Sequence, residues 1–405
     1  MLNIQLKKDE FIKGTWFIFI FLLIIDMGGG IGLKNLAFAI LILSIIFLFL
    51  CFKIKINLST YLIEFYIFFI CPLLLIGYST LFLKIPLSNQ IPQVTAFITF
   101  FSLLLATNLK NKDMLLKSIE KIAIVSACGI IFTFLGIYTL HIIGMDSVIY
   151  SINSITNTFN MGYIGINPLG NQIGLFLPNV YYVWSLLLIP FTLILIKRSK
   201  FNFIISIIAC IMTLSTGVVL FVMIGILLIT LLNMIFSLKI KLKLRYVIYS
   251  IVIGILTFSM LNMGIADLLF SKLNIYSNSS STKIGHIQSA LKEIFATPFT
   301  FLFGMGLGSS FYSIGAQAEV VNIEVSHFNL IRQFGILYFC IFLLYILNLI
   351  YEASKIDFEG KKIAVGLLML FIAAGTNPLL ISPVFFIWLV ITKSYIILSK
   401  KGERL

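Results

Sequence analysis

Charged residues are scarce in this sequence. Lys, Arg, Asp and Glu make up only 11% of its 405 residues, whereas hydrophobic residues make up 60%. The mean hydropathy is +1.10, and no water-soluble globular fold uses apolar residues so densely. Runs such as IFIFLLIID do not alternate apolar and polar residues, which excludes a membrane β-barrel. The sequence therefore predicts an all-α integral membrane protein, because backbone polar groups in hydrocarbon must be satisfied within helices.

Cysteine and histidine are also few, and their positions exclude two kinds of site. The five cysteines fall in or at the ends of apolar runs, as small core residues do, and predict no disulfide framework. His141, His286 and His327 have no i, i+4 spacing and no adjoining acidic pair, so we expect no metal and no other cofactor. The sequence contexts typical of a catalytic serine or cysteine are missing as well.

The apolar runs divide into about twelve spans, each near the roughly 20 residues that cross a bilayer. The run 201–237 would extend about 55 Å as one helix, so we expect a break at Ser215-Thr216-Gly217. The predicted spans cover residues 13–33, 35–52, 61–83, 91–109, 118–140, 180–196, 201–215, 218–237, 246–270, 326–350, 362–377 and 380–398.

The basic residues orient these predicted helices. Lys and Arg collect in short cytoplasmic loops, and with the N-terminus inside, most of the 29 basic residues fall in the inner segments. This distribution predicts about twelve helices with both termini in the cytoplasm. We therefore attribute the formal charge of +14 to the basic residues of the predicted cytoplasmic loops. A nucleic-acid partner is not expected, because the positive charges form no single stripe.

Two outer connections, residues 141–179 and 271–325, are much longer than the rest, and we expect function to use them. The first has no Lys or Arg and is rich in Asn, Ser, Thr, Gly and Tyr. That composition suits sugar hydroxyls and pyranose rings, although a solvated loop with turns is an equal alternative. In the second, residues 283–297 place apolar side chains at helical spacing and predict an amphipathic helix at the membrane surface.

Polar residues of the second connection continue into the next span. A Gly-x-Gly-x-Gly run at residues 304–308 allows backbone amides to approach an anion, with a plain loop as the alternative. Arg332 is a functional candidate because an ionisable group at membrane depth is costly, unless it snorkels to the outer headgroups. His327 is either functional or a structural histidine at the helix entry. It lies about 140° from Arg332 around the helix, so the two could flank one cavity only from different sides.

The order of these features resembles the Wzy/WaaL family, which contains O-antigen and related polysaccharide polymerases and the O-antigen ligases. The resemblance is strongest over residues 283–350, and weaker echoes are GLFLPN at 174–179 and LSTGVVLF at 214–221. The residues that carry it, in the order of the family, are Lys283, Pro298, GMGLGS at 304–309, His327 with Asn329, and Gly335. The chain departs from the family at three places. Asn171 with Gln172, and Thr216 with Gly217, stand where members commonly have Arg. Phe328 separates His327 from Asn329, whereas the family often has the His and Asn adjacent.

The resemblance implies a metal-independent glycosyltransferase with a GT-C-like architecture in the bacterial inner membrane, its active site facing the periplasm. Such an enzyme moves glycan from undecaprenyl diphosphate onto the next lipid-linked repeat unit, in company with a flippase and a chain-length regulator. The chemistry needs charge stabilisation on the leaving diphosphate and deprotonation of the acceptor hydroxyl. We expect His327, Arg332 and Glu324 to be catalytic. The expected substrate-binding residues are Lys272, Lys283, His286, Gly304, Gly306, Gly308 and Asn329.

Two alternatives remain open. An O-antigen ligase would use lipid A-core as the acceptor. A lipid-linked oligosaccharide flippase or other transporter would also have about twelve helices, but transporters typically show internal repeats and charges in the middle of the membrane. We see no repeat between residues 1–200 and 201–405, and Asp26 and Glu64 are the few candidate charges within spans.

Overall fold

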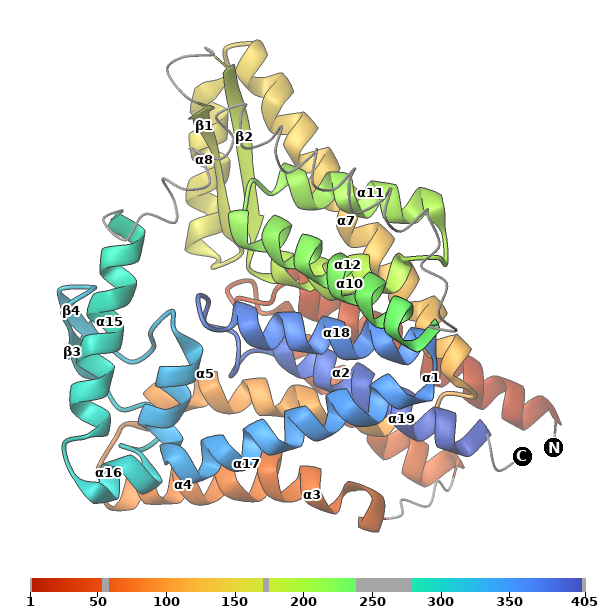
Figure 1. The fold of residues 1–405 in the computed structure, drawn as a ribbon, viewed down its shortest axis with the longest axis horizontal. Helices are drawn as coiled ribbons and strands as arrows, with labels where there is room; N and C mark the ends of the chain where they lie inside the picture. The colour runs from red at the N-terminus through yellow and green to blue at the C-terminus, as the bar shows by residue number, and fades with distance from the viewer. Residues whose placement is uncertain (1, 53–57, 170–174, 238–277, 403–405) are drawn as a thin grey trace.

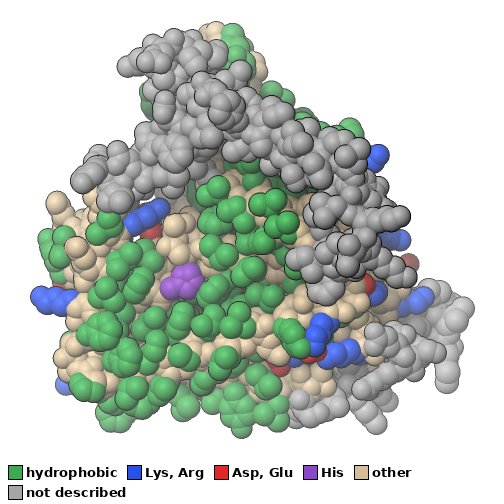
Figure 2. Space-filling view, viewed as in Figure 1, with side chains coloured by type: hydrophobic (Ala, Val, Ile, Leu, Met, Phe, Trp, Pro, Cys, Tyr) green, Lys and Arg blue, Asp and Glu red, His purple; other side chains and the backbone are tan. Residues whose placement is uncertain are grey.

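A computed structural model describes residues 2–52, 58–169, 175–237 and 278–402, and this part of the chain is mostly helical. Within it, six helical segments are long and apolar enough to cross a membrane, and three shorter apolar helices accompany them. Both chain termini lie at the same end of the molecule (Figure 1). Figure 2 shows hydrophobic side chains covering the described surface of one face, with the few visible charged side chains lying to either side.

The first half of the chain builds helices on both sides of a β-hairpin. Its elements are α1 (Leu2–Ile25), α2 (Leu33–Phe52), η1 (Leu58–Tyr61), α3 (Leu62–Phe65), the π-helical η2 (Tyr66–Ile70), α4 (Cys71–Leu81), α5 (Leu87–Ile98), η3 (Thr99–Ser102), α6 (Leu103–Ala106), α7 (Lys112–Ile142), α8 (Asp146–Thr158), β1 (Gly162–Leu169) and β2 (Leu175–Tyr182).

The second half carries a shorter hairpin and the most deeply buried helices. Its described elements are η4 (Val183–Leu187), α10 (Leu188–Leu195), α11 (Lys200–Met212), α12 (Thr216–Ser237), α15 (Asn278–Ile294), α16 (Pro298–Phe303), β3 (Phe311–Ser313), β4 (Ala318–Val320), α17 (Ser326–Ile356), α18 (Phe358–Ala373) and α19 (Pro383–Gly402).

Each predicted span within the described residues contains helix, but not always over its full length. The span 180–196 begins in strand β2, and the span 362–377 outlasts α18, which ends at Ala373. The predicted span 246–270 lies outside the described residues. The predicted break in the run 201–237 is confirmed, because α11 ends at Met212 and Leu214 takes a φ of +47° before α12 begins. The predicted end of the first span is wrong. The helix stops at Ile25, because the Asp26 carboxylate accepts hydrogen bonds from the amides of Ile31 and Lys34, both at 3.1 Å, and closes a turn.

The two long connections are folded. In the first, α8 and the antiparallel pair β1–β2 replace the solvated loop that was one reading of its sequence. The hairpin is anchored to α8, since the Asn153 side chain accepts a hydrogen bond from the Ile164 amide at 3.0 Å. In the second connection, the predicted amphipathic helix is confirmed as α15, although it begins and ends a few residues before 283–297.

The apolar side of α15 faces protein. Ala290 packs in a small cluster with Phe311 of β3 and with Ile323 and Val325, just before α17. Figure 1 shows α15 crossing the end of the bundle opposite the chain termini, together with α16 and the β3–β4 pair. The helix therefore packs across this end of the molecule, which is a position compatible with an amphipathic helix at a membrane surface.

The long helix α17 is interrupted at Gly335, which takes a φ of +82° and a ψ of 167°. A side chain there would collide with α16, since an added Cβ would lie 2.2 Å from the Leu302 carbonyl oxygen. The interruption frees two carbonyls, and these accept hydrogen bonds from the loop after α16. The Met305 amide donates to the Arg332 carbonyl at 2.7 Å, and the Gly306 amide donates to the Gln333 carbonyl at 3.2 Å. The first two turns of α17 are thereby fixed to the second long connection.

Replacing Gly335 with Ala should therefore destabilise the protein. Left-handed backbone at a non-glycine residue costs about 1–3 kcal/mol, and the collision with Leu302 adds to it. Thermal unfolding of the detergent-purified variant, followed by size-exclusion chromatography after heating, should show a clearly lower midpoint. Gly129→Ala on α7 is the matched control, because nothing lies within 4 Å of an added Cβ there and Ala favours a helix by up to about 1 kcal/mol. Equal midpoints for the two variants would contradict the interruption.

Candidate functional site

A small polar cavity is lined by residues of α5, of α17 and its preceding segment, and of the α18–α19 connection. These parts of the chain lie toward the end of the bundle opposite the termini (Figure 1). Its volume is about 120 Å³. Four polar residues line it, from three separate parts of the chain, and the apolar remainder of the lining is two prolines and one isoleucine. The lining residues are Gln93, Asn322, Ser326, Asn329, Pro92, Pro378 and Ile381.

Side-chain amides form the wall of this cavity. The Asn322 Oδ1 accepts three hydrogen bonds, from Gln93 Nε2 at 3.1 Å, Asn329 Nδ2 at 3.0 Å and Gln333 Nε2 at 3.2 Å. The Oε1 atoms of Gln93 and Gln333 are buried and, within the described residues, have no hydrogen-bond partner. A buried acceptor without a donor is costly. Gln93 lines the cavity, so a rotation of its amide would let this unpaired oxygen accept a hydrogen bond from a hydroxyl group there.

Ser326 joins the start of α17 to the α18–α19 connection. Its Oγ donates a hydrogen bond to the Asn377 carbonyl at 2.7 Å and accepts one from the Leu379 amide at 2.6 Å. Pro378, between these two residues, lines the cavity. The back of the cavity is therefore held by hydrogen bonds between the Ser326 hydroxyl and the backbone of the α18–α19 connection.

Arg332 lies directly behind the amides and is completely buried. Its guanidinium donates to the Ser309 carbonyl at 3.0 Å and the Ser309 Oγ at 2.8 Å. It also donates to the Val321 carbonyl at 2.6 Å and to Asn329 Oδ1 at 3.2 Å, and it stacks on the Phe311 ring at 4.3 Å. Arg332 does not snorkel, because its side chain does not reach the surface. Its NH groups bind protein acceptors in this structure, and the expected catalytic role stays a prediction. Its donors hold the second long connection on α17.

The charge of Arg332 is nevertheless only weakly compensated. Among the described residues, no carboxylate forms an ion pair with it, and Glu293 of α15 is near enough only for a longer-range Coulombic attraction. Its Nε is buried and unpaired. Because Asn329 bonds the guanidinium on one side and lines the cavity on the other, a positive potential extends into the cavity from behind.

The glycine run does not form the anion-binding loop that its sequence permits. Gly304, Gly306 and Gly308 all have positive φ, between +76° and +89°. Their neighbourhood is packed against protein, since an added Cβ at Gly304 would lie 2.4 Å from the Gln333 carbonyl oxygen. The amides of Met305 and Gly306 are bonded to α17, and the Leu307 amide donates to Ser79 Oγ at 2.8 Å. The run is a structural connector between α16, α17 and α4.

Glu324 lies two residues from Asn322 and is the exposed acid of the site, with 51% of its side chain accessible. It pairs with Lys283 of α15 at 3.7 Å. Burial lowers the pKa of His286, and the charge of Glu324 partly offsets this; His286 Nδ1 lies 2.5 Å from Ser313 Oγ. Burial, and secondarily Glu324, raises the pKa of Tyr181 on β2 to about 12. Glu324 therefore lies within Coulombic range of Tyr181, on the hairpin of the first long connection, and of His286 in the second.

His327 is separated from this group. Its ring packs edge-on to Phe371 of α18, with centroids 4.7 Å apart, and interacts with the Phe371 backbone. Within the described residues it does not line the cavity, whereas its neighbours Ser326 and Asn329 do. Of the residues that the sequence predicted for the site, Lys283, His286 and Glu324 lie near one another and Asn329 lines the cavity. His327, which the sequence also predicted, does not line the cavity. Lys272 lies outside the described residues.

Sequence reasoning missed Gln93 and Asn322. The two are 229 positions apart, and neither belongs to a local motif. The only hint is that a glutamine within an apolar span needs a hydrogen-bond partner. In the described part of the chain, no group of His, Cys, Asp and Glu could hold a metal ion. No protein-family model and no curated protein sequence matches the chain.

Arg332→Ala should lower the stability of the protein, independently of any effect on activity. It would leave the buried Ser309 carbonyl without a donor, at about 1–3 kcal/mol, and create a cavity in addition, whereas the Val321 carbonyl would keep the Gln333 Nε2 donor. The purified variant should therefore show much lower yield and a lower unfolding midpoint. Lys283→Ala is the control, because a partly exposed ion pair contributes at most about 1 kcal/mol. An Arg332→Ala protein as stable as the wild type would refute the structural role.

Proposed function

We propose that this protein is a membrane-embedded polysaccharide polymerase. It transfers a glycan from a polyprenyl diphosphate onto a sugar hydroxyl of the next lipid-linked repeat unit, at the outer leaflet of the bacterial inner membrane. The end of the bundle that carries both termini then lies in the cytoplasm, and the cavity faces the periplasm. The observation that carries the proposal is the amide-lined cavity with a buried cation behind it, at one end of an apolar helical bundle.

The amides support a sugar as the ligand. A cavity lined by Gln93, Asn322 and Asn329 offers donors and acceptors without a charged side chain on its wall, as neutral hydroxyl groups require. The unpaired Gln93 Oε1 favours a ligand that brings a donor. A carboxylate or phosphate would bring only acceptors, so the wall itself suits a hydroxylated ring better than an anion.

The buried Arg332 supports a diphosphate leaving group beside that ring. As the glycosidic C–O bond to the diphosphate breaks, negative charge grows on the leaving oxygen. A fixed positive potential stabilises that charge without any rearrangement of protein groups. Arg332 acts here through its field and through Asn329, which explains why a residue without access to the cavity suits this position.

Glu324 is the group that we assign as general base. Its carboxylate takes the proton from the acceptor hydroxyl while that oxygen bonds to the anomeric carbon, and polyprenyl diphosphate departs. Lys283, paired with Glu324 in the resting protein, is then free to approach the diphosphate. The proposal gives no proton-transfer role to His327, which was also expected to be catalytic, because its ring packs against Phe371 of α18.

Glu324→Gln should stop chain extension while leaving the protein abundant. The amide keeps the size of the side chain but cannot accept the proton, and loss of a positioned base costs about 10²–10⁴-fold in rate. The measurement is the surface glycan profile of a deletion strain that carries the variant, together with extraction of its lipid-linked intermediates. We expect single repeat units on lipid in place of a ladder.

Glu319→Gln is the matched control, since Glu319 is an exposed acid on β4 and its variant should restore the ladder. The same profile of the deletion strain separates the rival functions. Polymer that remains on its lipid carrier would indicate a ligase, and lipid-linked units retained on the cytoplasmic side would indicate a flippase. Either result, or a normal ladder with Glu324→Gln, would reject the proposal.

Gln93→Leu tests the sugar-binding wall separately from the base. The leucine removes both the donor to Asn322 and the unpaired acceptor, so chains should become shorter and the apparent affinity for lipid-linked substrate should fall about tenfold, as expected for one or two lost hydrogen bonds. Gln288→Leu, on an exposed position of α15, should leave chain length unchanged. Identical chain-length profiles for the two variants would remove the cavity from the proposal.

A further inference from the structure

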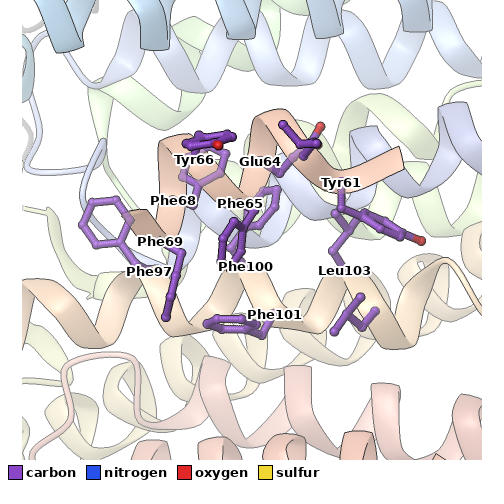
Figure 3. Close-up of a pocket in the computed structure, with 12 residues that line it drawn as sticks. Tyr61, Glu64, Phe65, Tyr66, Phe68, Phe69, Phe97, Phe100, Phe101 and Leu103 are labelled. Atoms are coloured by element: carbon purple, nitrogen blue, oxygen red, sulfur yellow. The ribbon is translucent and has the colours of Figure 1, made fainter. Parts of the chain in front are cut away.

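An aromatic groove opens on the side of the bundle, and it begins on α5 about one helical turn beyond the polar cavity. It runs between α3–η2 on one side and α5–η3–α6 on the other, with a volume of about 490 Å³. Figure 3 shows aromatic side chains from both helices in the space between them. Its lining residues are Tyr61, Leu62, Glu64, Phe65, Tyr66, Phe68, Phe69, Phe97, Phe100, Phe101, Leu103 and Leu104.

Both walls leave regular α-helical geometry at the groove. Residues Tyr66–Ile70 are π-helical, and Thr99–Ser102 opposite them form a 3₁₀ turn. A π-helical turn is rare and often marks a functional site. The floor is closed by Phe68 and Phe100, whose rings stack at 4.2 Å, and the outward-facing Phe65 and Phe69 stack at 5.0 Å.

The one carboxylate on the wall is already compensated. Glu64 Oε1 lies 2.5 Å from the Lys393 Nζ and accepts a hydrogen bond from the Tyr345 hydroxyl at 3.1 Å. Glu64 is itself buried, at 3% exposure. The groove therefore presents aromatic faces with almost no polar surface, within two helical segments long and apolar enough to cross a membrane. Its natural occupant is a hydrocarbon chain.

Basic side chains stand at the end of the groove that points toward the chain termini. The Tyr61 hydroxyl, at that end, is 2.9 Å from Thr107 Oγ1, and the Lys401 Nζ donates to the Thr107 carbonyl at 2.9 Å. Lys401 is exposed, and Lys8 lies near enough to repel it electrostatically. Lys401 near one end of an apolar groove, with Lys8 within Coulombic range of it, favours an anionic headgroup there.

We propose that this groove binds an anionic phospholipid. One acyl chain lies among the aromatic rings between α3–η2 and α5–η3–α6, and the phosphate lies at Lys401 and Lys8. This inference is independent of the polymerase proposal, because the groove and the polar cavity share no residue.

The test places a tryptophan reporter on the groove wall and measures its quenching by lipids with brominated acyl chains. The Phe101→Trp variant is reconstituted in phosphatidylcholine vesicles with increasing fractions of brominated phosphatidylglycerol or brominated phosphatidylcholine. The signal of the wild-type protein is subtracted, and its Trp16, Trp184 and Trp388 are buried. We expect phosphatidylglycerol to bind at the reporter about fivefold more tightly, the effect of one lysine near a membrane surface.

Two controls make the result specific. A reporter at Phe132→Trp, 73% exposed on α7, should show no headgroup preference. Adding Lys401→Ala to the groove reporter should abolish the preference, whereas Lys400→Ala should keep it, because Lys400 pairs with Glu352 at 2.7 Å.

Three outcomes would overturn the inference. Equal quenching by both headgroups at the Phe101→Trp reporter would show an unselective lipid contact. No quenching would show that protein covers the groove, as in an oligomer or a complex. Relief of quenching by polyprenyl phosphate, but not by unbrominated phosphatidylglycerol at the same mole fraction, would assign the groove to the polyprenyl carrier.

Discussion

A buried guanidinium needs carbonyl oxygens, and the structure around Arg332 is arranged to supply them. Val321 and Ser309 come from the second long connection, while Arg332 comes from α17, so each hydrogen bond joins the connection to the membrane helix. The interruption at Gly335 completes the junction, because it exposes α17 carbonyls to the amides of the glycine run. Removing either half would leave buried polar groups without partners, in a region where water cannot replace them.

The polar cavity follows from this junction. Once α17 is held against the connection, Asn322 lies opposite Asn329 and Gln333, and Gln93 of α5 completes the wall. In this arrangement, the polar groups on the cavity wall and the buried cation are different residues. Asn322 and Glu324 are exposed and Gln93 and Asn329 line the cavity, whereas the Arg332 guanidinium is completely buried behind them. Charge held in this way acts at short range in a medium of low dielectric, with little screening by salt.

Hydropathy predicted the helical spans and the break before α12, because each depends only on local apolar length. The end of α1 was missed because a single carboxylate, Asp26, ends the helix through hydrogen bonds that no periodicity reveals. The hairpin β1–β2 was missed because its Gly and Asn-Pro residues are equally typical of turns.

At the candidate site, Arg332 was singled out because it is an ionisable group within a predicted span. The role of Arg332 could not be read from sequence, since its acceptors are backbone carbonyls and carry no residue signature. Gln93 was missed for a related reason, because its partner Asn322 is distant in the chain.

The most direct measurement of the central claim uses purified components. The protein is reconstituted in vesicles and supplied with lipid-linked oligosaccharide extracted from cells that lack it, and mass spectrometry follows the products. A polymerase converts this substrate into chains that grow by whole repeat units and releases one polyprenyl diphosphate for each bond formed. Unchanged substrate with a correctly folded protein, or movement of the substrate across the bilayer without bond formation, would contradict the account.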